Sequence, residues 1–69
     1  MNSKPSVESL TQRELEILSY SAQGITTKGV ADLLGISYQT TRTHHKNIYK
    51  KLGVNSLIEA VAAYKRLEP

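Results

Sequence analysis

Three glycines, Gly24, Gly35 and Gly53, divide the chain into short segments, and this division constrains the fold more than any other feature. Glycine is favoured just past the end of a helix because it adopts the left-handed backbone found there. Apolar residues recur at helical intervals between the glycines, and no segment shows the sustained alternation of a half-buried strand. We therefore predict an all-α four-helix bundle, with helices over about residues 12–22, 27–34, 38–52 and 57–67.

Each predicted helix follows a polar residue that can cap its first turn. The stretches "TQRE" from Thr11 and "SLIE" from Ser56 match the capping box, in which a hydroxyl and a glutamate bond each other's backbone amides. Only Ile36 separates Gly35 from Ser37, the expected cap of the next helix. Two helices joined by so short a turn, with a glycine in it, indicate a helix-turn-helix.

The net charge of +3 is distributed unevenly along the chain. Residues 37–53 hold no acidic residue, whereas basic and acidic residues nearly balance elsewhere. The basic residues of this segment are Arg42, Lys46, Lys50 and Lys51. Basic residues gathered on one face are the electrostatic footprint of nucleic-acid binding. The function therefore depends on the direction in which this charge points.

Residues 38–52 divide into two faces when placed on a helix at about 100° per residue. The face predicted to be buried holds Thr41, His45, Ile48 and Leu52. The opposite face, which has no acid, holds Gln39, Arg42, Thr43, Lys46 and Lys50. A face that serves only solubility usually mixes both charges, and Gln, Arg, Thr and Lys bond base edges and phosphates in the major groove. This face therefore indicates DNA binding.

Other functions find no support in the sequence. There is no cysteine for a disulfide or a thiolate metal site. His44 and His45 point about 100° apart on a helix, with no metal-ligating residue at helical spacing, so we expect no metal and no other cofactor. No nucleophile, base and acid form a catalytic set, so we expect no enzyme. Without a membrane-spanning run or a signal peptide, we expect a cytoplasmic protein.

Taken in order, these segments resemble a known family. The stretches "LTQRELEIL", "AQGITTKGVADLLGIS", "TTRTHHKNIYKKLGV" and "EAV" look like the LuxR/FixJ-type, or NarL-like, DNA-binding domain of bacterial transcription regulators. The resemblance covers Leu10 to about Tyr64. It implies sequence-specific binding of double-stranded DNA, with the third helix in the major groove and the fourth helix contributing to a homodimer on DNA. It also makes RNA polymerase a candidate partner.

The resemblance assigns roles to individual residues. Base contacts are implied for Arg42, Thr43 and Lys46. Phosphate contacts are implied for a second set, partly at helix starts where backbone amides favour anions: Lys28, Ser37, Gln39, Thr40 and Lys50. Three apolar residues of the fourth helix cannot all face inward and offer a dimer surface: Leu57, Ile58 and Leu67.

Three positions depart from the family pattern. Gly29 stands where the family usually has a glutamate that would complete a capping box with Thr26, so we expect Gly29→Glu to stabilise the chain. Thr41 stands where the family usually has an aliphatic residue, and its hydroxyl needs a carbonyl one turn back as a partner. Leu57 stands where the family usually has an arginine, so a salt bridge from the fourth helix to the first is not expected.

Residues 1–9 are polar and contain Pro5, and we interpret them as a flexible tail or linker remnant before a helix-turn-helix domain over residues 10–69. The length fits the C-terminal output domain of a response regulator, or a small stand-alone regulator. Two other functions stay open: a helix-turn-helix that docks a protein without binding DNA, and a sigma-factor-like promoter-recognition domain. The acid-free face argues against the first, and "HHKNIYKKLGV" fits the regulator family better than the second.

Overall fold

The computed structural model describes residues 9–67, with side chains through Arg66. Its elements are α1 (Gln12–Ala22), α2 (Thr27–Leu34), α3 (Tyr38–Leu52) and α4 (Leu57–Leu67), and this part of the chain contains no strand. The predicted all-α fold and the four predicted ranges are confirmed. None of these helices is both long and apolar enough to cross a lipid bilayer. The tail predicted before residue 10 lies almost wholly outside the described residues.

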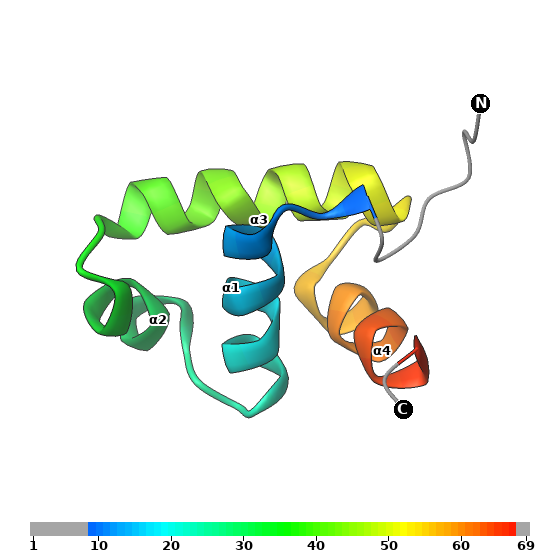
Figure 1. The fold of residues 1–69 in the computed structure, drawn as a ribbon, viewed down its shortest axis with the longest axis horizontal. Helices are drawn as coiled ribbons and strands as arrows, with labels where there is room; N and C mark the ends of the chain where they lie inside the picture. Colours follow the sequence, from blue (N-terminus) through cyan, green and yellow to red (C-terminus); the bar gives the residue numbers. More distant parts are fainter. Residues whose placement is uncertain (1–8, 68–69) are drawn as a thin grey trace.

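The longest helix, α3, lies across one side of the other three (Figure 1). In this view α1 is in the middle, α2 lies near the start of α3, and α4 lies near its end. All three pack against α3, and all three lie on the same side of it. One side of α3 is therefore used for packing, and none of the other three helices covers its opposite side.

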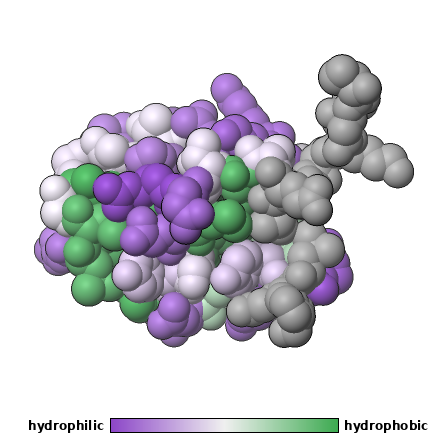
Figure 2. All heavy atoms as spheres, in the orientation of Figure 1, coloured by the Kyte–Doolittle hydropathy of each residue, from purple (hydrophilic) through white to green (hydrophobic). Residues whose placement is uncertain are grey.

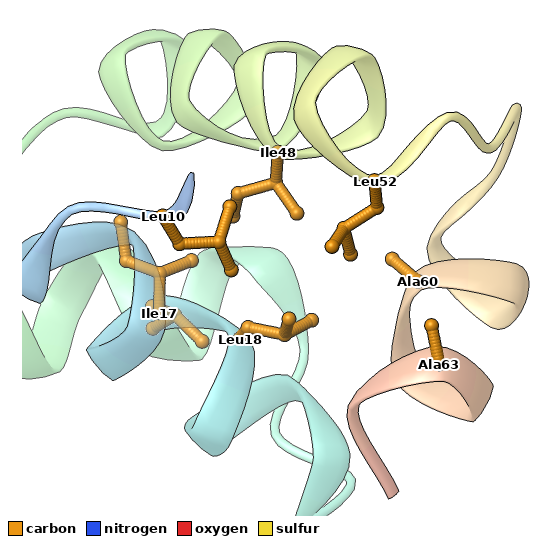
Figure 3. Packing of buried hydrophobic residues seen from close by; sticks show 8 residues of the cluster. Leu10, Ile17, Leu18, Ile48, Leu52, Ala60 and Ala63 are labelled. Carbon is orange, nitrogen blue, oxygen red and sulfur yellow. The ribbon is translucent and has the colours of Figure 1, made fainter. Parts of the chain in front are cut away.

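A single apolar cluster joins all four helices. Ile17 and Leu18 of α1, Ile48 of α3 and Val30 of α2 are fully buried. Ala60 brings α4 against the same cluster, and its small side chain lets the helix approach closely (Figure 3). Full burial of each large aliphatic side chain contributes about 1.5–3 kcal/mol, so a few residues stabilise the orientation of α3.

Side-chain caps begin the helices largely as predicted. At α1 the capping box is complete: the Glu14 amide donates to the Thr11 hydroxyl over 3.1 Å, and the Thr11 amide donates to the Glu14 carboxylate over 2.9 Å. At α4 the box is only half formed. The Glu59 amide donates to Ser56 Oγ over 3.3 Å, but the Glu59 carboxylate accepts from the Ser56 hydroxyl over 3.1 Å. A direct bond from hydroxyl to carboxylate is charge-assisted and replaces the predicted bond to the amide.

The turn between α2 and α3 is as short as predicted. Gly35 has φ 67° and ψ 33°, in the left-handed region, and the Ile36 amide donates to the Ala31 carbonyl over 3.1 Å. The Ser37 hydroxyl accepts from the Thr40 amide over 2.9 Å and begins α3. Ala31 is buried, and its small side chain lets α2 and α3 pack closely. The predicted helix-turn-helix is therefore confirmed.

Candidate nucleic-acid interface

The inner face of α3 is buried as predicted. Thr41 and Ile48 are fully buried, and His45 and Leu52 are nearly so. The Thr41 hydroxyl donates to the Ser37 carbonyl over 3.0 Å, which is the expected partner one turn back. This packing fixes the rotation of α3 about its own axis, and with it the direction of the side chains on the outer face.

His45 adds a polar contact between α3 and α1. Its Nε2 lies 3.5 Å from the hydroxyl oxygen of Ser21, and both side chains are buried. Its ring stacks on Tyr49 with centroids 6.2 Å apart and an angle of 15° between the planes. Burial lowers the pKa of His45 from 6.5, and the nearby cationic groups of His44 and Arg42 lower it further. His45 is therefore a neutral packing residue at pH 7 and not part of the cationic outer face.

Lys51 points towards α1 and not towards the open side of α3. Its ammonium donates to Glu14 Oε1 over 2.8 Å, and the Glu14 side chain is only 6% exposed. Burial by itself raises the pKa of Glu14, but the bonds from Lys51 and the Thr11 amide outweigh burial and hold the pKa below 4.5. Among the described residues no ion pair joins α4 to α1, and Leu57 is half-buried. Lys51 of α3 thus supplies the cationic partner of the buried Glu14 carboxylate.

The outer face of α3 is open to solvent. Figure 2 shows this edge of the molecule as mostly white to purple, which marks residues of intermediate to hydrophilic character. Arg42, Lys46 and Lys50 form no ion pair with any residue of the described chain, so their charge is not neutralised. Every residue predicted to contact DNA is exposed: Lys28, Ser37, Gln39, Thr40, Arg42, Thr43, Lys46 and Lys50.

The hydroxyl groups on the exposed start of α3 differ in what they can still donate. The Ser37 hydroxyl donates to Thr40 Oγ1 over 2.8 Å, and the Thr43 hydroxyl donates to the Gln39 carbonyl over 3.1 Å. Thr40 accepts from Ser37 and keeps its own hydroxyl proton free for a partner outside the chain. Of the three, Thr40 is the one best suited to donate to a phosphate oxygen.

The start of α2 offers a lysine and a single cap. Lys28 Nζ lies 3.3 Å from Asp32 Oδ2, and the two side chains are 78% and 70% exposed. An ion pair so exposed contributes little to stability, so Lys28 can exchange Asp32 for a phosphate. The Gly29 amide donates to the Thr26 hydroxyl over 3.1 Å, but a Cβ on residue 29 would lie 2.8 Å from Ile25 Cγ2. This contact opposes the stabilisation expected of Gly29→Glu.

Asn47 of α3 offers a possible DNA contact that the sequence did not predict. Asn47 lies one turn after Thr43 and is exposed, at the edge of the outer face. Its amide can bond an adenine edge or a phosphate. The sequence offers no signal for this role, because Asn47 is uncharged and lies outside the arc of predicted contacts.

Apolar side chains remain uncovered on α4 and α2. Ile58 is 83% exposed, so the prediction that α4 cannot turn all its apolar residues inward is confirmed for Ile58. The side chain of Leu67, predicted for the same surface, lies outside the described residues. Leu33 of α2 is 59% exposed, and Figure 2 shows hydrophobic atoms gathered over α2.

The described surface supports the binding of a polyanion more readily than other chemistry. In residues 9–67 no three His, Cys, Asp or Glu side chains are arranged to hold a metal ion. The arrangement that does exist is a rigidly packed helix with three unpaired cations in a line and polar side chains between them. Such a helix fits the major groove of DNA, where its length follows the groove and its side chains reach bases and phosphates.

Comparison with known families gives one match over most of the chain. The model described as bacterial regulatory proteins, luxR family, matches residues 8–64. The matched span contains α1, α2 and α3 entirely and the larger part of α4.

Individual bacterial proteins similar to this chain are consistent with the family match. The chain is 42% identical over 55 residues to the nitrate/nitrite response regulator protein NarP of Escherichia coli (strain K12), covering 80% of this chain and 26% of NarP. It is 41% identical over 59 residues to the Fimbriae Z protein of the same strain, covering 86% and 28%. It is 47% identical over 58 residues to the uncharacterized response regulatory protein YgeK of that strain, covering 84% and 40%. The chain thus spans less than half the length of these relatives.

Proposed function

The chain belongs to the luxR family of bacterial regulatory proteins and is a DNA-binding domain of a transcription regulator, and we propose that it binds double-stranded DNA by inserting α3 into the major groove. The observation that carries this proposal is the contrast between the two faces of α3. The inner face is fixed by buried contacts, whereas the outer face presents unpaired cations and no acid.

Within this proposal, two groups of side chains have different roles. Arg42, Thr43 and Lys46 read base edges, since they lie in the N-terminal part of α3, which enters the groove in a helix-turn-helix. A second group holds the sugar–phosphate backbone and contributes affinity without sequence preference: Lys28, Ser37, Gln39, Thr40 and Lys50.

Four further proposals concern the complete regulator. We propose that two copies meet on DNA through α4, supported by the exposure of Ile58 beside the half-buried Leu57. Contact with RNA polymerase is also proposed, with no residue of this chain assigned to it. The proposed site of action is the cytoplasm, where a bacterial chromosome lies, and the proposed role excludes catalysis.

The test combines salt dependence with selection from a randomised duplex pool. Lys50→Ala should weaken binding to every duplex about equally and reduce the salt dependence by about one charge. Arg42→Ala should abolish the preference at one base pair while keeping most non-specific affinity, because a bidentate arginine–guanine pair discriminates by about 1–3 kcal/mol. Arg13→Ala, which removes an exposed arginine that pairs with Glu16 on α1, is the matched control and should change neither quantity.

The same experiment distinguishes the competing functions. A wild-type chain that selects no sequence and binds DNA weakly at all salt concentrations would support the protein-docking helix-turn-helix. Selected sites that stay identical in Arg42→Ala, with only the overall affinity reduced, would make Arg42 a phosphate contact and leave base reading to Thr43 and Lys46.

A further inference from the structure

Two threonines on opposite faces of α3 make the same bond to their own helix. The Thr41 hydroxyl donates to the Ser37 carbonyl over 3.0 Å, and the Thr43 hydroxyl donates to the Gln39 carbonyl over 3.1 Å. Because a carbonyl oxygen only accepts, each hydroxyl donates its single proton to the backbone of its own helix. Thr41 is fully buried in the core. A threonine bonded in this way has no proton left to donate outside the helix, although its oxygen can still accept. Its methyl group remains available for apolar contacts.

Thr43 makes the same bond to its own helix as Thr41 but lies on the exposed outer face. It is exposed, and it lies beside Arg42 and one turn before Lys46 and Asn47 on the outer face. Because a β-branched side chain is stiff at χ1, the bond that holds the hydroxyl against the backbone also fixes the position of the methyl group. Thr43 is therefore a small apolar contact among side chains that bear charge or an amide.

We infer that Thr43 is a specificity-determining residue that reads a methyl-bearing base through its own methyl group. This inference rests on the proposed function and adds to it the chemistry of one contact. In the major groove the C5-methyl of thymine is the apolar group that a threonine methyl contacts. The hydroxyl proton cannot reach a base acceptor without breaking the bond to Gln39. The expected partner is thus thymine, and not an acceptor of guanine or adenine.

Thr40 supplies the contrast within the same helix. It is also exposed, but its hydroxyl accepts from Ser37 and retains its own proton. Thr40 can donate to a phosphate oxygen, whereas Thr43 can do so only by breaking its bond to the Gln39 carbonyl. Replacement by valine should therefore weaken DNA binding at Thr40 but not remove the proposed contact at Thr43.

The first arm of the test uses the 69-residue chain and the duplex that it selects from a randomised pool. Each thymine of that duplex is replaced in turn by deoxyuridine, which lacks only the methyl group. One replacement should weaken binding by about fourfold, the effect expected from loss of one buried methyl contact. If no replacement changes the affinity, the inference is overturned while the proposed function stands. If the chain selects no sequence, both are overturned.

The second arm changes the protein. Thr43→Val keeps the methyl group and removes the hydroxyl, so it should keep the thymine-over-deoxyuridine preference. Thr43→Ser keeps the hydroxyl and removes the methyl group, so it should lose that preference. Thr40→Val is the control and should weaken binding to all sequences while the preference stays. A Thr43→Val chain that loses the preference would show that the Thr43 methyl group does not make the contact with the thymine methyl, and the inference would be wrong. Thermal melts confirm that the variants remain folded.

Discussion

The starts of α1 and α2 use the same threonine cap in different surroundings. At α1, Thr11 and Glu14 form a reciprocal box, and the buried Glu14 also accepts from Lys51 of α3. At α2 only one bond of a box exists, from the Gly29 amide to the hydroxyl of the exposed Thr26. The start of α1 is thereby joined to another helix, whereas the start of α2 depends on a local bond.

The difference shows how a helix cap can support a binding surface at a distance. The Glu14 carboxylate accepts from the Thr11 amide in the cap of α1. It also bonds Lys51 near the end of α3, the helix that carries the proposed DNA contacts. Nothing comparable joins the cap of α2 to its neighbours among the described residues. We therefore expect changes at the start of α1 to affect stability strongly, and changes at the start of α2 to have smaller effects.

Removing Glu14 should have the largest effect. Glu14→Ala eliminates the box and leaves the Lys51 ammonium without its carboxylate, so we expect a loss of about 2–4 kcal/mol in the free energy of unfolding. Glu14→Gln is the matched control, because glutamine also completes a capping box but carries no charge. Its loss should be clearly smaller in urea unfolding experiments. Equal losses for the two variants would mean that the ion pair with Lys51 provides the stability and that the capping box contributes little.

Acid should weaken the start of α1 and leave that of α2 unaffected. The folded-state pKa of Glu14 is below 4.5, so its stabilising contribution is present above that pH and is lost as the pH falls through the lowered folded pKa. Glu14→Gln should lack this part of the acid unfolding curve. His45, whose folded pKa is below 6.5, begins a separate loss as the pH falls below 6.5, since the unfolded chain binds the proton more readily.

The two pH ranges can be separated by circular dichroism at constant temperature. The loss beginning below 6.5 should persist in Glu14→Gln, because that variant leaves His45 unchanged. A Glu14→Gln chain with the same acid midpoint as the wild type would contradict the role assigned to Glu14.

At α2 the corresponding change should be modest. Thr26→Ala removes the one side-chain bond to the Gly29 amide, and loss of such a cap costs about 1 kcal/mol. Thr26→Ser keeps the hydroxyl and should restore most of the stability. A loss from Thr26→Ala as large as that from Glu14→Ala would break the distinction between the two helix starts.

These contrasts also show what the sequence can and cannot reveal. Periodicity, glycines and caps predict the helix ranges, because these signals act within one or two turns. They also predict the buried face of α3, including the bond from the Thr41 hydroxyl to the Ser37 carbonyl. The exposure of the predicted DNA contacts follows from the same angular argument. Their roles in binding bases or phosphates stay predictions.

What the sequence does not predict is the choice among tertiary partners. Lys51 belongs to the basic segment, yet it bonds Glu14, which lies 37 positions earlier in the chain. Ser21 and His45 meet across two helices in the same way. The bond that the Thr43 hydroxyl donates to the Gln39 carbonyl of the same helix depends on a side-chain rotamer. Such pairings are decided by three-dimensional packing, which local spacing does not determine.

The smallest expected effect is that of Gly29→Glu. Sequence alone favours stabilisation, since glutamate is a better helix former than glycine by about 0.5–1 kcal/mol and would complete the box with Thr26. The Cβ, however, would lie 2.8 Å from Ile25 Cγ2 and 3.3 Å from Thr26 Oγ1. Rotating Ile25 away costs about 0.5–1.5 kcal/mol. The terms nearly cancel, so we expect a net change below about 0.5 kcal/mol.

A double-mutant cycle separates the terms. In an Ile25→Ala background the obstructing methyl group is absent, and Gly29→Glu should then stabilise by about 0.5–1.5 kcal/mol relative to Ile25→Ala alone. Gly29→Ala meets the same obstruction without supplying a carboxylate, so in the wild-type background it should be less stable than Gly29→Glu. Urea unfolding of the single and double variants gives the coupling energy between the two positions. A coupling near zero, with full stabilisation by Gly29→Glu alone, would mean that Ile25 yields freely. The open cap of α2 would then reflect only the missing glutamate.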